Sequence, residues 1–83
     1  MINLVTHKDP ARALRNAVNG IDGIAQVPPG QIIAYWQGDY NDQVHNTKVG
    51  RAAWELHEQG KVHLFQRKLQ DEPIRFQYEV HVK

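Results

Sequence analysis

The last ten residues of the chain alternate strictly between apolar and polar side chains. The apolar positions are Ile74, Phe76, Tyr78, Val80 and Val82. Because successive side chains of a strand point to opposite faces, a period of two is typical of a half-buried β-strand. The fold must therefore contain a sheet, with one face of this strand packed against a core.

Two other segments suit strands. Residues 62–69 precede the turn-forming sequence Gln70-Asp71-Glu72-Pro73, so residues 62–82 are predicted to form a C-terminal β-hairpin. Residues 31–37 (QIIAYWQ) are β-branched and aromatic and lie between two glycines. Apolar residues on both of its faces predict a central or covered strand. Residues 2–5 could add an edge strand.

The first helix is predicted from its start signal. Asp9 is a preferred N-cap and Pro10 suits the first helical position. Apolar residues then recur at helical spacing until Asn19-Gly20, at Ala11, Leu14, Ala17 and Val18. Residues 20–30, which contain three glycines and two prolines, are expected to form a loop pinned by Ile21, Ile24 and Val27.

A second helix is expected over about residues 47–59, with Asn46 or Asp42 as its cap and Gly60 in the left-handed conformation after it. The predicted class is therefore α+β, a single domain over residues 1–83 in the order α-β-α-β-β. Rotation at 100° per residue groups the core-facing side chains, which are Val49, Ala52, Ala53 and Leu56.

Trp54 falls opposite that apolar stripe. A tryptophan in this position either packs beneath a second layer of the same domain or marks a surface for a partner or a second copy of the chain. We favour the first alternative, with the N-terminal helix or the loop before the first strand as the covering layer.

Length and composition narrow the class of protein. A chain of 83 residues has room for one small core, and without cysteine it cannot be stapled by disulfides. Self-association is the remaining route to added stability, so we expect a homodimer. No apolar signal-peptide region or transmembrane run is present, and we expect a cytoplasmic protein that does not enter a membrane.

The segment AWELHEQGKVHLFQRKL and the later IRFQYEVHV resemble the back half of winged helix-turn-helix domains. In that family a recognition helix is followed by a turn, a strand, a basic wing and a returning strand. The matching residues are Leu56, Gly60, Val62, Leu64, Arg67 and Tyr78. The resemblance covers about the last 37 residues. Between the first strand and the second helix only a one-turn helix around residues 42–45 would fit.

The resemblance implies a small regulator, of the kind that phages and plasmids encode, that binds double-stranded DNA. Lys48 and Arg51 at the helix start are the candidates for phosphates or guanine edges, and the hairpin cations would contact the flanking backbone. Those hairpin cations are Arg67, Lys68 and Arg75. The formal net charge of only +1 gives this hypothesis no general support. The alternative is an inhibitor or adaptor that docks on a host protein through Trp54 or a hairpin edge.

Catalytic and metal chemistry have no recognisable motif in this chain. The five histidines lack the spacing of HExxH or Cys-His zinc sites. No GxSxG elbow, Walker loop or GxGxxG is present. We therefore expect no enzyme activity, no catalytic residue, no metal and no cofactor.

Overall fold

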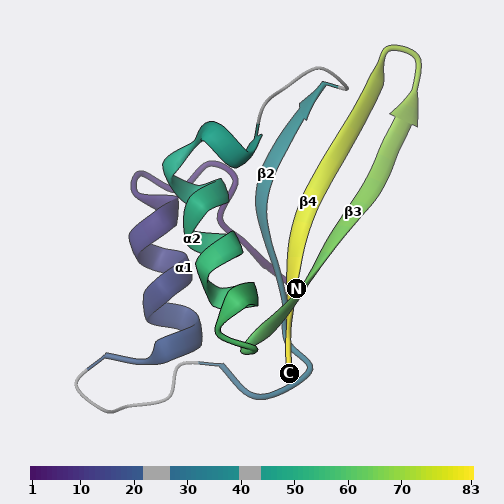
Figure 1. The fold of residues 1–83 in the computed structure, drawn as a ribbon. Helices are drawn as coiled ribbons and strands as arrows, with labels where there is room; N and C mark the ends of the chain where they lie inside the picture. Colours follow the sequence, from purple (N-terminus) through teal and green to yellow (C-terminus); the bar gives the residue numbers. More distant parts are fainter. Residues whose placement is uncertain (22–26, 40–43) are drawn as a thin grey trace.

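A four-stranded mixed sheet carries two α-helices on one face (Figure 1). These elements come from a computed structural model, which describes residues 1–21, 27–39 and 44–83. The sheet order is β1-β2-β4-β3, made from Ile2–Asn3, Ile32–Asp39, Ile74–Val82 and Val62–Asp71 respectively. The predicted α+β class is confirmed.

Strand β2 is central, as its apolar composition predicts. It pairs with β1 in parallel and with β4 in antiparallel fashion. The edge strand expected at residues 2–5 is shorter, because only Ile2 and Asn3 pair with β2. A bulge between Ala34 and Trp36 shifts the register of β2 against β4.

The C-terminal hairpin is confirmed, and it is longer than predicted. Strand β3 continues to Asp71, which pairs with Ile74, so the turn contains only Glu72 and Pro73. A second bulge, between Lys68 and Gln70, shifts the register near the tip. The hairpin rises past the helices, so its tip protrudes from the body of the domain (Figure 1).

Helix α1, Pro10–Asn19, begins as the sequence predicts. The Asp9 side chain accepts a hydrogen bond from the Arg12 backbone N–H at 3.3 Å, which satisfies one of the unpaired donors of the first turn. Leu14 is fully buried beneath this helix. The predicted loop after α1 is described only in part. Val27 packs against the core, Ile21 is 46% exposed, and Ile24 lies outside the described residues.

Helix α2, Lys48–Glu58, is capped by Thr47, and the predicted caps Asn46 and Asp42 were wrong. The Thr47 hydroxyl accepts a hydrogen bond from the Gly50 N–H at 3.0 Å and donates one to the Val44 carbonyl at 2.6 Å. A single 3₁₀ turn, η1 (Val44–Asn46), directly precedes this cap. The predicted one-turn helix is therefore present as η1, although residues 42 and 43 lie outside the described part of the chain.

Gly50 allows η1 to pack directly on α2. A Cβ built on Gly50 would lie 1.9 Å from the Val44 carbonyl oxygen, far inside contact distance. Val44 is 2% exposed and belongs to the core, so this close approach joins η1 to the helix layer. Gly60 after α2 has a φ of 74°, the left-handed conformation that the sequence predicts there.

The core lies between the helices and one face of the sheet. Its fully buried members include Leu14, Ile33, Leu56, Val62 and Val80. The four apolar positions predicted to face the core from α2 are all buried, which confirms the rotation of this helix. Leu56 also accepts the Lys61 N–H through its carbonyl, which holds the sharp turn from α2 into β3.

We expect the Gly50→Ala variant to lose about 1–3 kcal/mol of unfolding free energy, because its methyl group would displace the Val44 carbonyl. Urea unfolding followed by circular dichroism should give a lower midpoint with an unchanged slope. Glu58→Ala, an exposed change near the end of the same helix, is the control and should stay within about 0.5 kcal/mol of the parent. Equal stability of Gly50→Ala and the parent would contradict the close contact.

Candidate functional site

The first candidate surface is the N-terminal half of α2. Lys48 and Arg51 are exposed, and among the described residues neither side chain makes a hydrogen bond or an ion pair. Both helices begin at the same end of the domain, where the hairpin tip also lies (Figure 1). Helix N-termini carry partial positive charge, which adds to that of the two side chains. This end can therefore attract an anionic partner.

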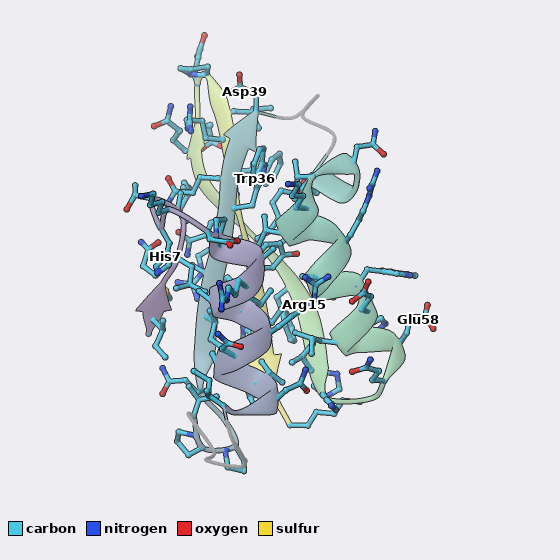
Figure 2. The ribbon with its side chains drawn as sticks, turned by 90° about the vertical axis from the view of Figure 1, so that its left-hand side faces the viewer. His7, Arg15, Trp36, Asp39 and Glu58 are labelled. Atoms are coloured by element: carbon cyan, nitrogen blue, oxygen red, sulfur yellow. The ribbon has the colours of Figure 1, made fainter. Side chains whose placement is uncertain are left out.

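A groove between the two helices extends this surface. It has a volume of about 380 Å³, and four cations and two carboxylates line it. The cations are Arg12, Arg15, Lys48 and Arg51, and the carboxylates are Asp9 and Glu55. Arg15 reaches from α1 toward α2 and pairs with Glu55 at 3.1 Å (Figure 2). Arg12 and Arg15 are not among the site residues predicted from the sequence, because the sequence does not reveal that α2 lies beside them.

The three hairpin cations differ from those of α2, because each has a carboxylate partner. Lys68 pairs with Asp71 at 2.8 Å, and Arg75 lies 3.8 Å from Asp39. The hydrogen bond and charge of Lys68 hold the pKa of Asp71 below its usual value. These exposed pairs contribute little to stability, but they offset the charge that the hairpin offers to phosphate.

Arg67 belongs to a different face of the molecule. Cross-strand register places Arg67 opposite Gln77, on the face of the sheet that the helices do not cover. We call this the open face. Its guanidinium lies 3.2 Å from Glu79, whose side chain is only 2% exposed. Arg67 and Arg51 therefore do not share one surface, although the sequence suggested a joint helix-and-wing site.

Glu79 is the centre of a buried polar network that the sequence did not predict. Gln77 donates to Glu79 at 2.8 Å and accepts a hydrogen bond from Gln37 at 2.8 Å. His81 lies 3.3 Å from the same carboxylate. The alternation of β4 predicted a solvent-exposed polar side, yet Gln77 and Glu79 are 6% and 1% exposed. The contact between Arg67 and Glu79 could have been predicted from the sequence, because pairing the two hairpin strands brings these two residues close together.

Opposing effects act on the Glu79 carboxyl. Burial alone would raise its pKa, but hydrogen bonds from Gln77 and His81 and the charge of Arg67 outweigh this cost. The pKa of Glu79 therefore lies below its ordinary value, and the group stays ionised at neutral pH. An ionised, fully engaged carboxylate suits a structural role better than proton transfer.

Trp54 is exposed, and the predicted burial beneath a second layer was wrong. The residue is 49% exposed, and its ring centre lies 5.4 Å from that of His57 on the same helix. Helix α1 packs beside α2 without covering this position. About half of the side chain is therefore exposed to solvent.

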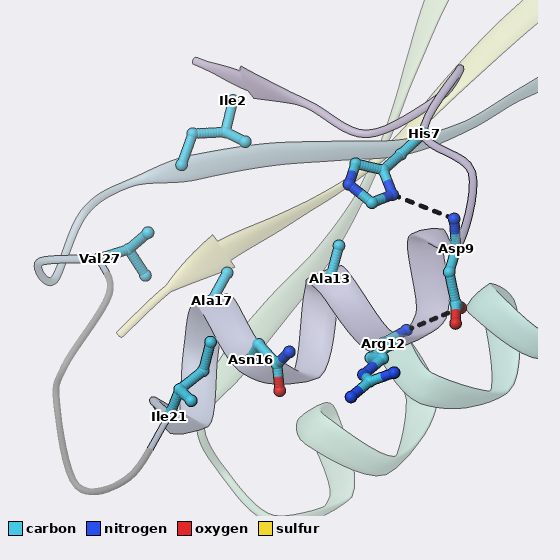
Figure 3. Close-up of a pocket in the computed structure, with 9 residues that line it drawn as sticks. All are labelled: Ile2, His7, Asp9, Arg12, Ala13, Asn16, Ala17, Ile21 and Val27. Atoms are coloured by element: carbon cyan, nitrogen blue, oxygen red, sulfur yellow. Dashed lines mark hydrogen bonds between the residues drawn. The ribbon is translucent and has the colours of Figure 1, made fainter.

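A pocket of about 420 Å³ lies between β1, α1 and Val27 (Figure 3). Its polar groups take part in starting α1, since the His7 ring nitrogen Nδ1 accepts the Asp9 N–H and Asp9 accepts the Arg12 N–H. Within the described ranges, no three His, Asp or Glu side chains gather so that they could hold a metal ion. Likewise, no helix there is long and apolar enough to cross a membrane.

Comparisons with protein-family models, with curated protein sequences and with solved structures found no match to this chain. The function must therefore be inferred from the side chains and their geometry.

Glu79 makes stability depend on pH. Because its pKa is lowered by folding, its contribution is complete above the unfolded pKa of 4.5 and is lost as the pH falls through the folded pKa. We expect the unfolding free energy of the parent to fall below about pH 4.5, and that of Glu79→Gln to fall less steeply.

Urea unfolding at several pH values between neutrality and about pH 3 measures this difference. The control is Asp71→Asn, which removes an exposed carboxylate at the hairpin tip and should alter the profile less. Parallel pH profiles for the parent and Glu79→Gln would contradict a stabilising role for the ionised carboxylate.

Proposed function

We propose that the protein is a small DNA-binding regulator that contacts duplex DNA with the N-terminal half of α2 and the adjoining end of the helix layer. The observation that carries this proposal is the exposure of Lys48 and Arg51 without carboxylate partners among the described residues. Every hairpin cation singled out from the sequence has such a partner.

The order of the elements supports the proposal. After the short strand β1, which pairs with β2 in parallel, the chain runs α1, β2, η1, α2, β3, β4, and strands β2, β4 and β3 are neighbours in that order with antiparallel pairing. This agrees with the winged-helix resemblance, in which a short helical turn precedes the recognition helix and a hairpin wing follows it. In such domains the recognition helix lies in the major groove, with its N-terminal residues at the base edges.

The proposed contact relies on phosphate attraction more than on base reading. Lys48 and Arg51 lie one turn apart on α2, with the helix N-terminus beside them, so together they can approach one stretch of backbone. Lys68 lies on the helix-facing side of the hairpin, opposite Phe76, and could reach the flanking backbone once DNA displaces Asp71. Arg67, fixed to Glu79 on the open face, has no part in the contact.

We expect the double variant Lys48→Ala/Arg51→Ala to bind duplex DNA more weakly and with a shallower salt dependence. Loss of two phosphate contacts should lower the log–log slope by about 1.8. Fluorescence anisotropy of a labelled duplex, over salt concentrations upward from about 50 mM, gives both quantities.

The matched control is Lys61→Ala/Lys83→Ala. It removes the same net charge from the opposite end of the domain, where the Lys83 N–H bonds the Lys61 carbonyl. If the two double variants lose affinity and slope equally, binding is a matter of net charge alone and the proposed surface is wrong. Absence of binding by the parent at low salt would remove the proposal altogether.

Trp54 favours a second function, docking on a protein partner. Tryptophan is enriched among residues that dominate binding energy, and here it is half exposed in the middle of α2. We expect Trp54→Ala to release a stoichiometric protein captured from nuclease-treated host lysate, while Lys48→Ala/Arg51→Ala retains it. Retention by Trp54→Ala would exclude this surface as the docking site.

A further inference from the structure

The open face of the sheet combines an exposed aromatic ring with polar groups that already satisfy one another. Register places Asn3, Ala34, Glu79 and Phe65 in one row across all four strands. Phe65 is 49% exposed, and its ring lies over that of His81 with centres 4.0 Å apart and an interplanar angle of 30°. An exposed, flat aromatic pair on a sheet face is typical of a contact surface.

Charge on the open face is balanced internally. Arg67 pairs with Glu79 and Arg75 with Asp39, so the formal charges of these four side chains sum to zero. DNA would require cations without carboxylate partners. These paired groups bring no net repulsion against a second copy of the same face, and Met1, whose sulfur lies 3.7 Å from the Gln77 amide nitrogen and which is 63% exposed, adds apolar area.

The area available suits a small dimer. Strands of eight to ten residues, spaced about 4.8 Å apart, give the open face a flat area of about 500 Å². Because side chains project from this plane, the solvent-accessible area of the open face is larger than its flat area. It approaches the roughly 800 Å² that each partner buries in a standard interface. A domain of 83 residues without disulfides also gains most from such a partner, because its own core is small.

We propose that the open face is the interface with a second copy of this chain, with the two sheets packed face to face. Sheets packed in this way lie about 10 Å apart, and each helix layer would lie on the outside of the dimer. This assigns dimerisation to Phe65 and its neighbours and leaves Trp54 outside the interface.

The spacing of the two α2 helices in this dimer bears on DNA binding, and this step rests on the proposed function. Four packed layers, each about 10 Å from the next, separate the outer α2 helices by about 30 Å. Helix-turn-helix dimers contact half-sites about 34–36 Å apart. A two-fold axis along the strands would leave both α2 N-termini at the same end, so one dimer could contact two successive major grooves.

Sedimentation equilibrium of the full chain, without DNA, tests the interface. We expect the parent to weigh twice the 9.6 kDa of the monomer, and Phe65→Asp to raise the dissociation constant at least about tenfold, because its carboxylate would be buried beside Glu79. Trp54→Asp, the same charge on an aromatic residue of equal exposure, should associate like the parent. A monomeric parent at about millimolar concentration, or unchanged association of Phe65→Asp, would overturn the proposal.

Isotope-filtered nuclear Overhauser spectra of a mixed labelled and unlabelled parent need no variant, so they decide the matter even if Phe65→Asp fails to fold. Intermolecular signals from the Phe65 and His81 rings are expected. Signals from Trp54 instead, or none from the open face, would contradict the interface. Both readouts are independent of DNA, so failure of this interface and failure of DNA binding are separate results.

Discussion

The two helices cover only one face of the sheet, and this one-sided packing determines the chemistry of both surfaces. Along β4, Val80 and Val82 pack toward the helices while Gln77 and Glu79 point the other way. The second pair is nevertheless buried, with the Arg67 guanidinium 3.2 Å from Glu79 and the Met1 sulfur 3.7 Å from the Gln77 amide nitrogen. A carboxylate without such partners would be costly at this depth, so the network is what allows a polar row to cross the middle of the sheet.

The cationic side chains of the domain fall into two groups, which differ in whether a carboxylate lies beside them. Those of the sheet, such as Arg67 and Arg75, are neutralised by carboxylates nearby in the fold. Those at the start of α2, Lys48 and Arg51, have no such partner among the described residues. A net charge of +1 therefore conceals an uneven distribution, in which one end of the helix layer is positive and the open face is balanced. These two surfaces suit different partners.

Local signals in the sequence were sufficient to predict the helices and strands, but not which side chains pack around them. Asp9-Pro10 and the alternation of β4 act within a few residues, so α1 and the hairpin could be predicted. The cap Thr47 was missed although its bonds to Gly50 and Val44 are local, because the neighbouring Asn46 ranks higher as a capping residue. Rotation placed Trp54 opposite the core stripe correctly, but a helical wheel does not reveal whether another layer covers it. The partner of Arg67 depends on hairpin register, which no single strand specifies.

The claim that the helix end and the open face have separate roles is tested most directly by amide chemical shifts. A titration of the ¹⁵N-labelled chain with a duplex of about two helical turns, at low salt, reports on every backbone N–H at once. The account predicts shift changes concentrated at residues 48–54 and near the start of α1, with residues 63–67 and 77–81 unaffected. Changes centred on the open face, with the start of α2 unaffected, would contradict it.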